Sequence, residues 1–207
     1  MSLLSALEYA SVFIFALTGA LVASRAQLDL IGFIFIAALT AVGGGTVRDV
    51  ILNRDTVFWV ANPGLIGVAA IAALLVFFTA HLLESRYRGI VWLDALALAV
   101  AVPSGVGVAL AMDMTWPVII IMGITTGCFG GLMRDVVCNE VPLILKQGEL
   151  YVTCALAGAT TTVGALALGL PESLALLSCA GATFALRGGS IAFGWCLPVY
   201  KSFPPRQ

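Results

Sequence analysis

The stretch "GGGTVRDVILN" at residues 43–53 decides the fold, because most of it returns 86 residues later as "GGLMRDVVCN" at residues 130–139. Residues 44–53 match this second stretch at six of ten positions. The same offset pairs further residues along the chain: Leu7 with Leu93, Glu8 with Asp94, Gly19 with Gly105, Val22 with Val108, Ala23 with Ala109, and Thr40 with Thr126. A match at one offset over this length indicates duplication of a whole structural unit.

The composition indicates that this unit lies in a membrane. Hydrophobic residues make up 61% of the chain and charged residues 10%, and the mean hydropathy is +1.08, whereas about a quarter of a soluble domain is charged. Apolar runs of about twenty residues, enough to cross the hydrocarbon core as helix, occupy residues 5–24, 31–52, 64–83, 89–112, 116–138, 149–170 and 173–197. Because backbone groups in lipid must bond to one another, the sequence predicts an all-α protein with seven transmembrane helices.

The repeat boundaries divide one transmembrane domain, residues 1–207, into related parts. We expect repeat 1 at residues 1–87, repeat 2 at 88–171, a seventh helix at 172–198 and a short tail at 199–207. A unit with three crossings is odd, so its second copy must enter the membrane from the opposite face. The sequence therefore predicts inverted repeats, an arrangement frequent in transport proteins.

The basic residues predict the orientation. One side of the membrane carries Arg54 alone, with Arg48 close by, and the other side carries Arg25, Arg86, Arg88, Lys146, Lys201 and Arg206. Positive charge marks the cytoplasmic side, so we expect the N-terminus outside and the C-terminus inside. The segment "ALVASRA" resembles a signal cleavage site, but the first basic residue is Arg25, so we expect a retained first helix.

Glycines precede the repeated arginine in both copies. Helical side chains lean toward the N-terminus and cover residues three and four positions back. We therefore expect each guanidinium to lie over bare backbone, where a glycine break leaves carbonyls free to accept its hydrogen bonds. The residues concerned are Gly43, Gly44 and Gly45 before Arg48, and Gly130 and Gly131 before Arg134.

The arginine and the following aspartate project about 100° apart on a helix, which is not the usual geometry of a helical pair. We therefore hypothesise exchange between repeats, in which Arg48 pairs with Asp135 and Arg134 pairs with Asp49. Small residues at every fourth position also predict that helices 31–52 and 116–138 cross closely. These residues are Ala37, Ala41 and Gly45 in one helix, and Gly123, Gly127 and Gly131 in the other.

Other intramembrane polar residues are candidates for function. Arg187 lies well inside the last apolar run and needs a partner or water; the candidate partners are Glu8, Asp49, Asp94 and Asp135. Glu8 and Asp94 stand near the starts of their helices, so we expect capping or interfacial placement for both. If those helices face a pathway, Thr18 and Ser104 offer hydroxyl groups to a passing ion.

Several classes of function fit poorly. Each candidate aspartate of an aspartyl protease follows an arginine directly, and the single histidine, His81, lies near a helix end, so the sequence does not indicate an intramembrane enzyme. No basic cluster indicates nucleic acid binding. We expect no cofactor and no metal beyond transient potassium or sodium.

The motifs "GGGTVRDVILN", "GGLMRDVVCNEVPLILKQGELY" (residues 130–151) and "LRGGSIAFGWCLP" (residues 186–198) resemble the prokaryotic branch of the TRIC family, the trimeric intracellular cation channels. The resemblance implies a homotrimer in the prokaryotic inner membrane, in contact with lipid. It also implies a monovalent-cation pore, for potassium, inside each protomer between the repeats. The pore helices would kink at the glycines named above. The second copy has Phe129 in place of the third glycine, and this side chain would narrow one half-pore.

Arginine near a cation path repels the ion, so a channel requires that Asp49 and Asp135 neutralise the arginines or that the arginines act as a gate. Cation binding would then fall to glycine carbonyls, Thr46 and the carboxylates. Bacterial relatives are also described as glycine-type transporters. A carrier for glycine or another small solute is therefore the alternative, and a structural scaffold is the third reading.

Overall fold

The computed structural model describes residues 3–82, 86–146 and 150–198. Within these ranges the regular structure is entirely helical, which confirms the predicted all-α class. The helices are α1 (Leu3–Arg25), α2 (Leu30–Ile51), α3 (Phe58–Ala61), α4 (Gly64–Thr79), α5 (Arg86–Ala111), α6 (Trp116–Val137), α7 (Tyr151–Ala167) and α8 (Glu172–Phe193). Two 3-10 turns, η1 (Ala80–Leu82) and η2 (Leu143–Leu145), complete the description.

Most of the predicted apolar runs coincide with membrane-length helices. In the described part of the chain, six helical segments are long and apolar enough to cross a membrane, and the apolar helix α7 is shorter. Large apolar side chains on their outer faces are exposed, among them Ile31, Phe78 and Val136. Such a surface fits a lipid environment.

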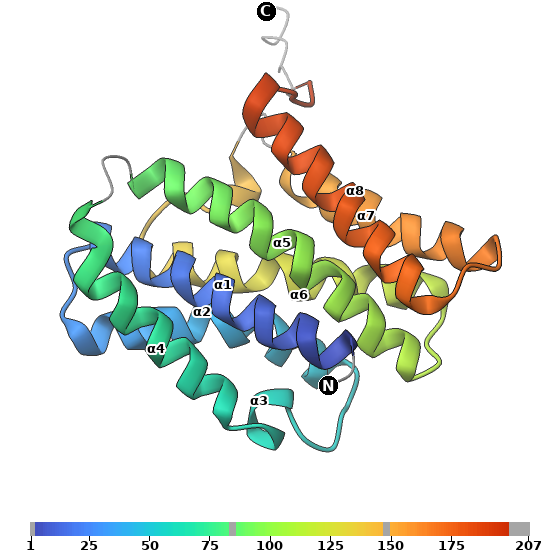
Figure 1. The fold of residues 1–207 in the computed structure, drawn as a ribbon, viewed down its shortest axis with the longest axis horizontal. Helices are drawn as coiled ribbons and strands as arrows, with labels where there is room; N and C mark the ends of the chain where they lie inside the picture. The colour runs from blue at the N-terminus through green and yellow to red at the C-terminus, as the bar shows by residue number, and fades with distance from the viewer. Residues whose placement is uncertain (1–2, 83–85, 147–149, 199–207) are drawn as a thin grey trace, which may run out of the picture.

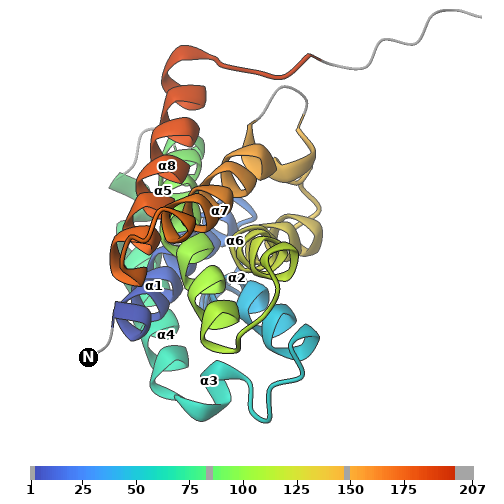
Figure 2. The ribbon, with the colours of Figure 1, turned by 90° about the vertical axis from the view of Figure 1, so that its right-hand side faces the viewer.

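The helices pack around two central pairs. Figures 1 and 2 show α1 and α5 side by side in one layer and α2 and α6 in a second layer. Helices α3 and α4 lie at one edge, and α7 and α8 lie at the opposite edge. Thus α1 packs against α2 and α4 in the first half of the chain, while α5 packs against α6 and α8 in the second half.

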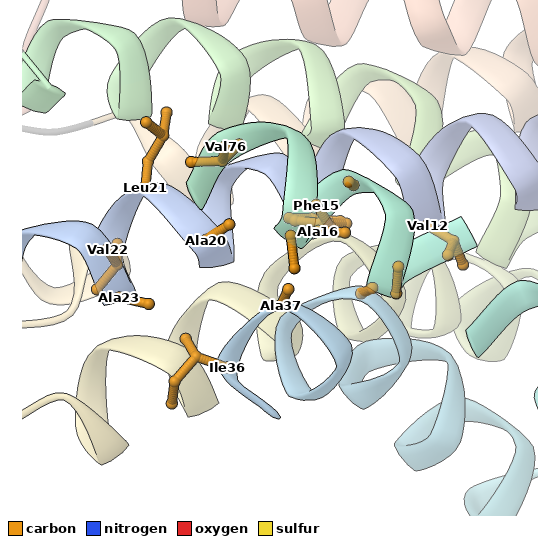
Figure 3. Close-up of a cluster of buried hydrophobic side chains, with 14 of the residues drawn as sticks. Val12, Phe15, Ala16, Ala20, Leu21, Val22, Ala23, Ile36, Ala37 and Val76 are labelled. Carbon is orange, nitrogen blue, oxygen red and sulfur yellow. The ribbon is translucent and has the colours of Figure 1, made fainter. Parts of the chain in front are cut away.

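Alanines and branched side chains fill the core of the first half. Figure 3 shows the buried side chains of α1 between those of α2 and α4, with Ala37 of α2 below and Val76 of α4 above. Ala16 and Ala20 of α1 are completely buried. Side chains this small let helix backbones approach closely, which is the usual basis of helix association in membranes.

The first helix pair of each half makes the same close contact. A Cβ added to Gly19 would collide with the Thr40 side chain, whose hydroxyl donates a 2.6 Å hydrogen bond to the Ile36 carbonyl. The equivalent residues of the second half, with a 2.7 Å hydrogen bond, are Gly105, Thr126 and Met122. These residues lie 86 positions apart in the sequence, so the duplication extends to packing.

The helix ends repeat as well. Among the described residues, the non-glycine positions with positive φ are Gln27 and Asp113, at 53° and 52°, and Asn53 and Asn139, at 51° and 54°. Each pair is separated by the repeat offset. Because a left-handed residue lets the chain leave a helix sharply, both halves turn at the same points.

The predicted crossing of the two central glycine-containing helices is confirmed. A Cβ on Gly44 of α2 would overlap the Thr126 carbonyl oxygen, and a Cβ on Gly130 of α6 would overlap the Thr40 carbonyl oxygen. Both helices run through their glycines without interruption. The expected glycine break is therefore wrong, because these glycines allow backbone contact rather than freeing carbonyl groups.

We predict that Gly44→Ala and Gly130→Ala each destabilise the protein, because overpacking against a backbone carbonyl costs about 1–3 kcal/mol. Thermal unfolding of purified protein in detergent measures the effect. Gly67→Ala and Gly164→Ala are matched controls, since a Cβ at either helical position meets no neighbouring atom. Alanine at these control sites should be neutral or stabilising by up to about 1 kcal/mol; equal effects at all four positions would contradict the packing role.

Candidate functional site

The first arginine of the repeated motif, Arg48, pairs with its own neighbour. Its Nε donates a 2.8 Å hydrogen bond to Oδ1 of Asp49, and both side chains are almost fully buried. The other carboxylate oxygen of Asp49 accepts a 2.8 Å bond from the Phe58 backbone N–H, and Arg54 donates to Oδ1 at 3.1 Å. Asp49 therefore joins the end of α2 to the segment that begins α3.

The second arginine repeats this arrangement. Arg134 Nε donates a 2.7 Å hydrogen bond to Oδ1 of Asp135, and Asp135 Oδ2 accepts a 3.0 Å bond from the Leu143 backbone N–H. The hypothesis of exchange between repeats is therefore wrong for both arginines. The long arginine side chain curls around its helix, so a separation of about 100° does not prevent contact with the adjacent residue.

Each arginine also has a second carboxylate partner. Arg134 Nη1 lies 2.9 Å from Asp94 Oδ1, and Arg48 Nη2 lies 3.6 Å from Glu8 Oε1. The expectation of helix capping or interfacial placement is therefore wrong for Asp94, which is fully buried, whereas interfacial placement of Glu8, with 16% of its side chain exposed, stays a prediction. A carboxylate beside each arginine follows from the high cost of a lone charge in the membrane.

Thr18 and Tyr151 complete the site around Arg134. The Thr18 hydroxyl donates to the Phe15 carbonyl at 2.8 Å and accepts a 2.9 Å bond from Arg134 Nη1. The Tyr151 hydroxyl donates to Asp94 Oδ2. Because Thr18 belongs to α1 and Arg134 to α6, this hydroxyl links the two halves of the chain.

Arg187 is fully buried on α8, as the sequence predicted. Its guanidinium lies 5.2 Å from the centre of the Tyr151 ring, a cation–π distance. Of the four candidate acids, Asp94 is thus connected to it, through Tyr151. Tyr151 was missed by the sequence reasoning, since it has no counterpart in the first repeat, where Leu65 stands at the equivalent position.

A small cavity lies beside Arg48, between the two halves. The residues around it come from α1, α2, α3, α5 and α6: Glu8, Ser11, Val12, Ala41, Gly45, Arg48, Phe58, Ser104 and Thr126. The space open to the centre of a water molecule is about 10 Å³, which corresponds to about one water. The cavity is therefore narrow, and polar side chains make up much of its wall.

Some predicted site residues lie elsewhere. Thr46 donates to the Val42 carbonyl at 2.7 Å and accepts a 2.9 Å bond from Trp59 Nε1, and it does not line the cavity. Phe129 is half-buried and is likewise absent from the cavity wall. Gly131 lies beneath Arg134 as predicted, with Nη2 3.6 Å from a Cβ built there. The guanidinium hydrogen bonds seen in the described chain go to side chains, so the glycine carbonyls do not solvate the arginines.

The two halves share an electrostatic plan, although Arg54 adds a second cation beside Asp49 in the first half. Each combines one buried arginine with two carboxylates, an aspartate on the same helix and an acid on α1 or α5. Such clusters keep the charges paired in a medium where an isolated charge is costly. Among the residues that the structure describes, no three histidine, cysteine or carboxylate side chains converge as ligands of a bound metal would.

Comparison with known proteins follows the same duplication. The chain matches the family model described as glycine transporter over residues 5–81 and 91–167, two ranges offset by 86 residues at both ends. It is 37% identical over 204 residues to a UPF0126 membrane protein of Vibrio cholerae, which covers 96% of this chain and 83% of that protein. It is 33% identical to the Escherichia coli inner membrane protein YadS, with 94% of each chain covered.

Solved structures give the same result. The TRIC trimeric intracellular cation channel orthologue from Rhodobacter sphaeroides has a TM-score of 0.90 and 40% identity, covering 94% of this chain and 100% of that chain. A second TRIC cation channel structure has a TM-score of 0.86 and 28% identity, covering 98% and 100%.

The apolar helices and these relatives define a multi-pass membrane transport protein rather than an enzyme. The chain belongs to the prokaryotic TRIC family, whose family model carries the description glycine transporter.

We predict that Asp94→Asn strongly destabilises the protein, because it leaves Arg134 buried with one carboxylate fewer, a change that costs about 3–5 kcal/mol. Thermal unfolding in detergent tests this. Glu140→Gln is the matched control, since Glu140 and Arg25 form a partly exposed ion pair at 3.5 Å, and such pairs contribute about 1 kcal/mol or less. A loss for Asp94→Asn no larger than that of the control would count against a structural role for this pair.

Proposed function

We propose that the protein is a monovalent-cation channel whose pore runs through each protomer between the two repeats. The observation that carries the proposal is the cavity between α1, α2, α5 and α6, where Glu8, Ser11 and Ser104 supply oxygen atoms. Carboxylate and hydroxyl oxygens replace the hydration shell of a cation in selective pores. The similar solved structures of TRIC cation channels support the same function.

The duplication supports a pore on the pseudo-twofold axis. The repeat-equivalent contacts of Gly44 and Gly130 bring α2 and α6 together beside the cavity. We infer seven membrane crossings, because the 17 residues of α7 meet the lower limit of about 17–25 for a spanning helix. Repeat 1 (1–87) and repeat 2 (88–171) then have opposite orientations in the membrane, and helix 172–198 follows them.

The arginines are compatible with cation passage because their charge is neutralised locally. Arg48 and Arg54 are balanced by Asp49 and Glu8, whereas Arg134 faces Asp135 and Asp94, so the first group is neutral and the second carries a net negative charge. Neutralised arginines do not repel a cation, and the Glu8 carboxylate that lines the cavity attracts one. Potassium, which is large and loosely hydrated, is the ion that we propose. The cavity must widen for conduction, since it now holds about one water.

The assembly and placement follow from the family. We propose a homotrimer of such protomers in the inner membrane of a prokaryote, surrounded by lipid. The surplus of basic residues on one side supports a cytoplasmic C-terminus and an external N-terminus.

We predict unitary currents from the purified protein in planar bilayers under a potassium chloride gradient. The currents should reverse near the potassium equilibrium potential, because the Glu8 carboxylate lines the cavity and the nearby arginines are neutralised by carboxylates. Gly67→Ala, which alters an open position on α4, should leave them unchanged.

Silence in the bilayer would contradict the channel if the same preparation were folded. Saturable uptake of labelled glycine by liposomes would then favour a carrier, and absence of both activities would favour a scaffold.

A further inference from the structure

The two arginine sites share a plan but differ in how firmly they are held. Arg134 donates through Nε to Asp135 and through Nη1 to both Thr18 and Asp94. Arg48 donates through Nε to Asp49, while its contact with Glu8 spans 3.6 Å, beyond the range of a hydrogen bond. Among the described residues, Nη2 has no hydrogen-bond partner in either arginine, so the difference lies in Nη1, which donates two bonds in Arg134.

Two substitutions between the repeats explain the looser site. Ser104 stands where the repeat offset aligns it with Thr18, but it lines the cavity. Leu65 stands where the offset aligns it with Tyr151, so the first half lacks the hydroxyl that donates to Asp94 in the second. The first site thus lacks the counterparts of the hydrogen bonds that Thr18 and Tyr151 make in the second. Glu8 keeps 16% of its side chain exposed, whereas Asp94 is fully buried.

We propose that Glu8 is the cation-binding residue of the pore and that Arg48 competes with the cation for the Glu8 carboxylate. Arg134 has a purely structural role. The binding site consists of the Glu8 carboxylate with the hydroxyls of Ser11 and Ser104. The Nη2 end of Arg48 occupies the position beside Glu8 when no ion is bound. A potassium ion displaces it, while the Nε bond to Asp49 keeps the arginine attached to its helix.

The size and charge of the cavity suit this exchange. A space of about 10 Å³ admits one body of about the size of a water molecule, and a dehydrated potassium ion has similar dimensions. On moving away, Arg48 gives up its 3.6 Å ion pair with Glu8 and its contact with the Phe58 ring, whose centre lies 5.3 Å from the guanidinium, but no hydrogen bond to Glu8. Arg134 cannot act in the same way, because its displacement would break bonds to both Thr18 and Asp94.

This inference rests on the proposed channel function, so binding and conduction are measured separately. Binding is tested by soaking crystals of the full-length protein in thallium, a heavy monovalent cation of potassium-like size. An anomalous peak beside Glu8 is expected in the wild type and should be absent in Glu8→Gln. A missing peak in the wild type, or a peak that persists in Glu8→Gln, would overturn the proposed site whether or not the protein conducts.

Conduction is tested by single-channel recording with three variants. Glu8→Gln should reduce potassium conductance at low salt by about tenfold, because it removes a charge in direct contact with the ion, and should weaken selectivity against chloride. Glu8→Asp should restore part of both. Glu140→Gln removes a carboxylate outside the cavity and should leave conductance and selectivity unchanged.

The arginines are compared in the same recordings. Arg48→Gln should raise the open probability severalfold in folded protein, since it removes the competitor. Arg134→Gln should instead lower thermal stability. A conducting wild type whose Glu8→Gln and Glu140→Gln variants behave alike would refute the inference while leaving the channel intact, and a silent wild type would refute the channel itself.

Discussion

The structure depends on the pairing of arginine with carboxylate away from water. An unpaired guanidinium in the membrane is costly, so each buried arginine must be accompanied by acids fixed at the right positions. The aspartate that follows each arginine on the same helix is its first partner, and the acid on the preceding helix is its second partner. These requirements hold α1 against α2 and α5 against α6. They also determine where the loop after each pair can begin, because each aspartate accepts a backbone hydrogen bond from that loop.

Much of the fold could be predicted from the sequence because lipid permits few solutions. Long apolar runs located the helices, and the 86-residue offset related their two sets. The crossing of α2 and α6 was predicted from small residues at every fourth position, but those residues face other elements. Gly123 and Gly127 face Val102 of α5 and Gly45 faces Phe58, whereas Gly44 and Gly130 make the crossing. The sequence did not predict that both helices continue through their glycines without interruption. A glycine permits either a kink or a close contact, and only the position of the Thr126 and Thr40 carbonyls shows which of the two occurs.

The site was predictable in its membership but less so in its pairing. Arg48, Asp49, Arg134 and Asp135 were found from the repeated motif, and Arg187 from its depth in an apolar run. Their partners were assigned wrongly because helical spacing describes where Cβ atoms point, whereas arginine carries its charge several bonds farther out. Glu8 and Asp94 aligned with one another at the repeat offset, which was the signal that both belonged with the arginines. Tyr151 gave no such signal, because Leu65 replaces it in the first half.

The reciprocal glycine contacts have a mechanical consequence. Gly44 rests on the backbone of α6 and Gly130 rests on the backbone of α2, so the two helices touch at one point without intervening side chains. Helices joined in this way rotate relative to one another about the contact more easily than they separate. Separation of α2 from α6 would break the whole contact, whereas a small rotation about the contact moves the helix ends over larger distances. The contact of Gly44 and Gly130 thus lets a small change in the crossing angle of α2 and α6 become a larger displacement of their ends.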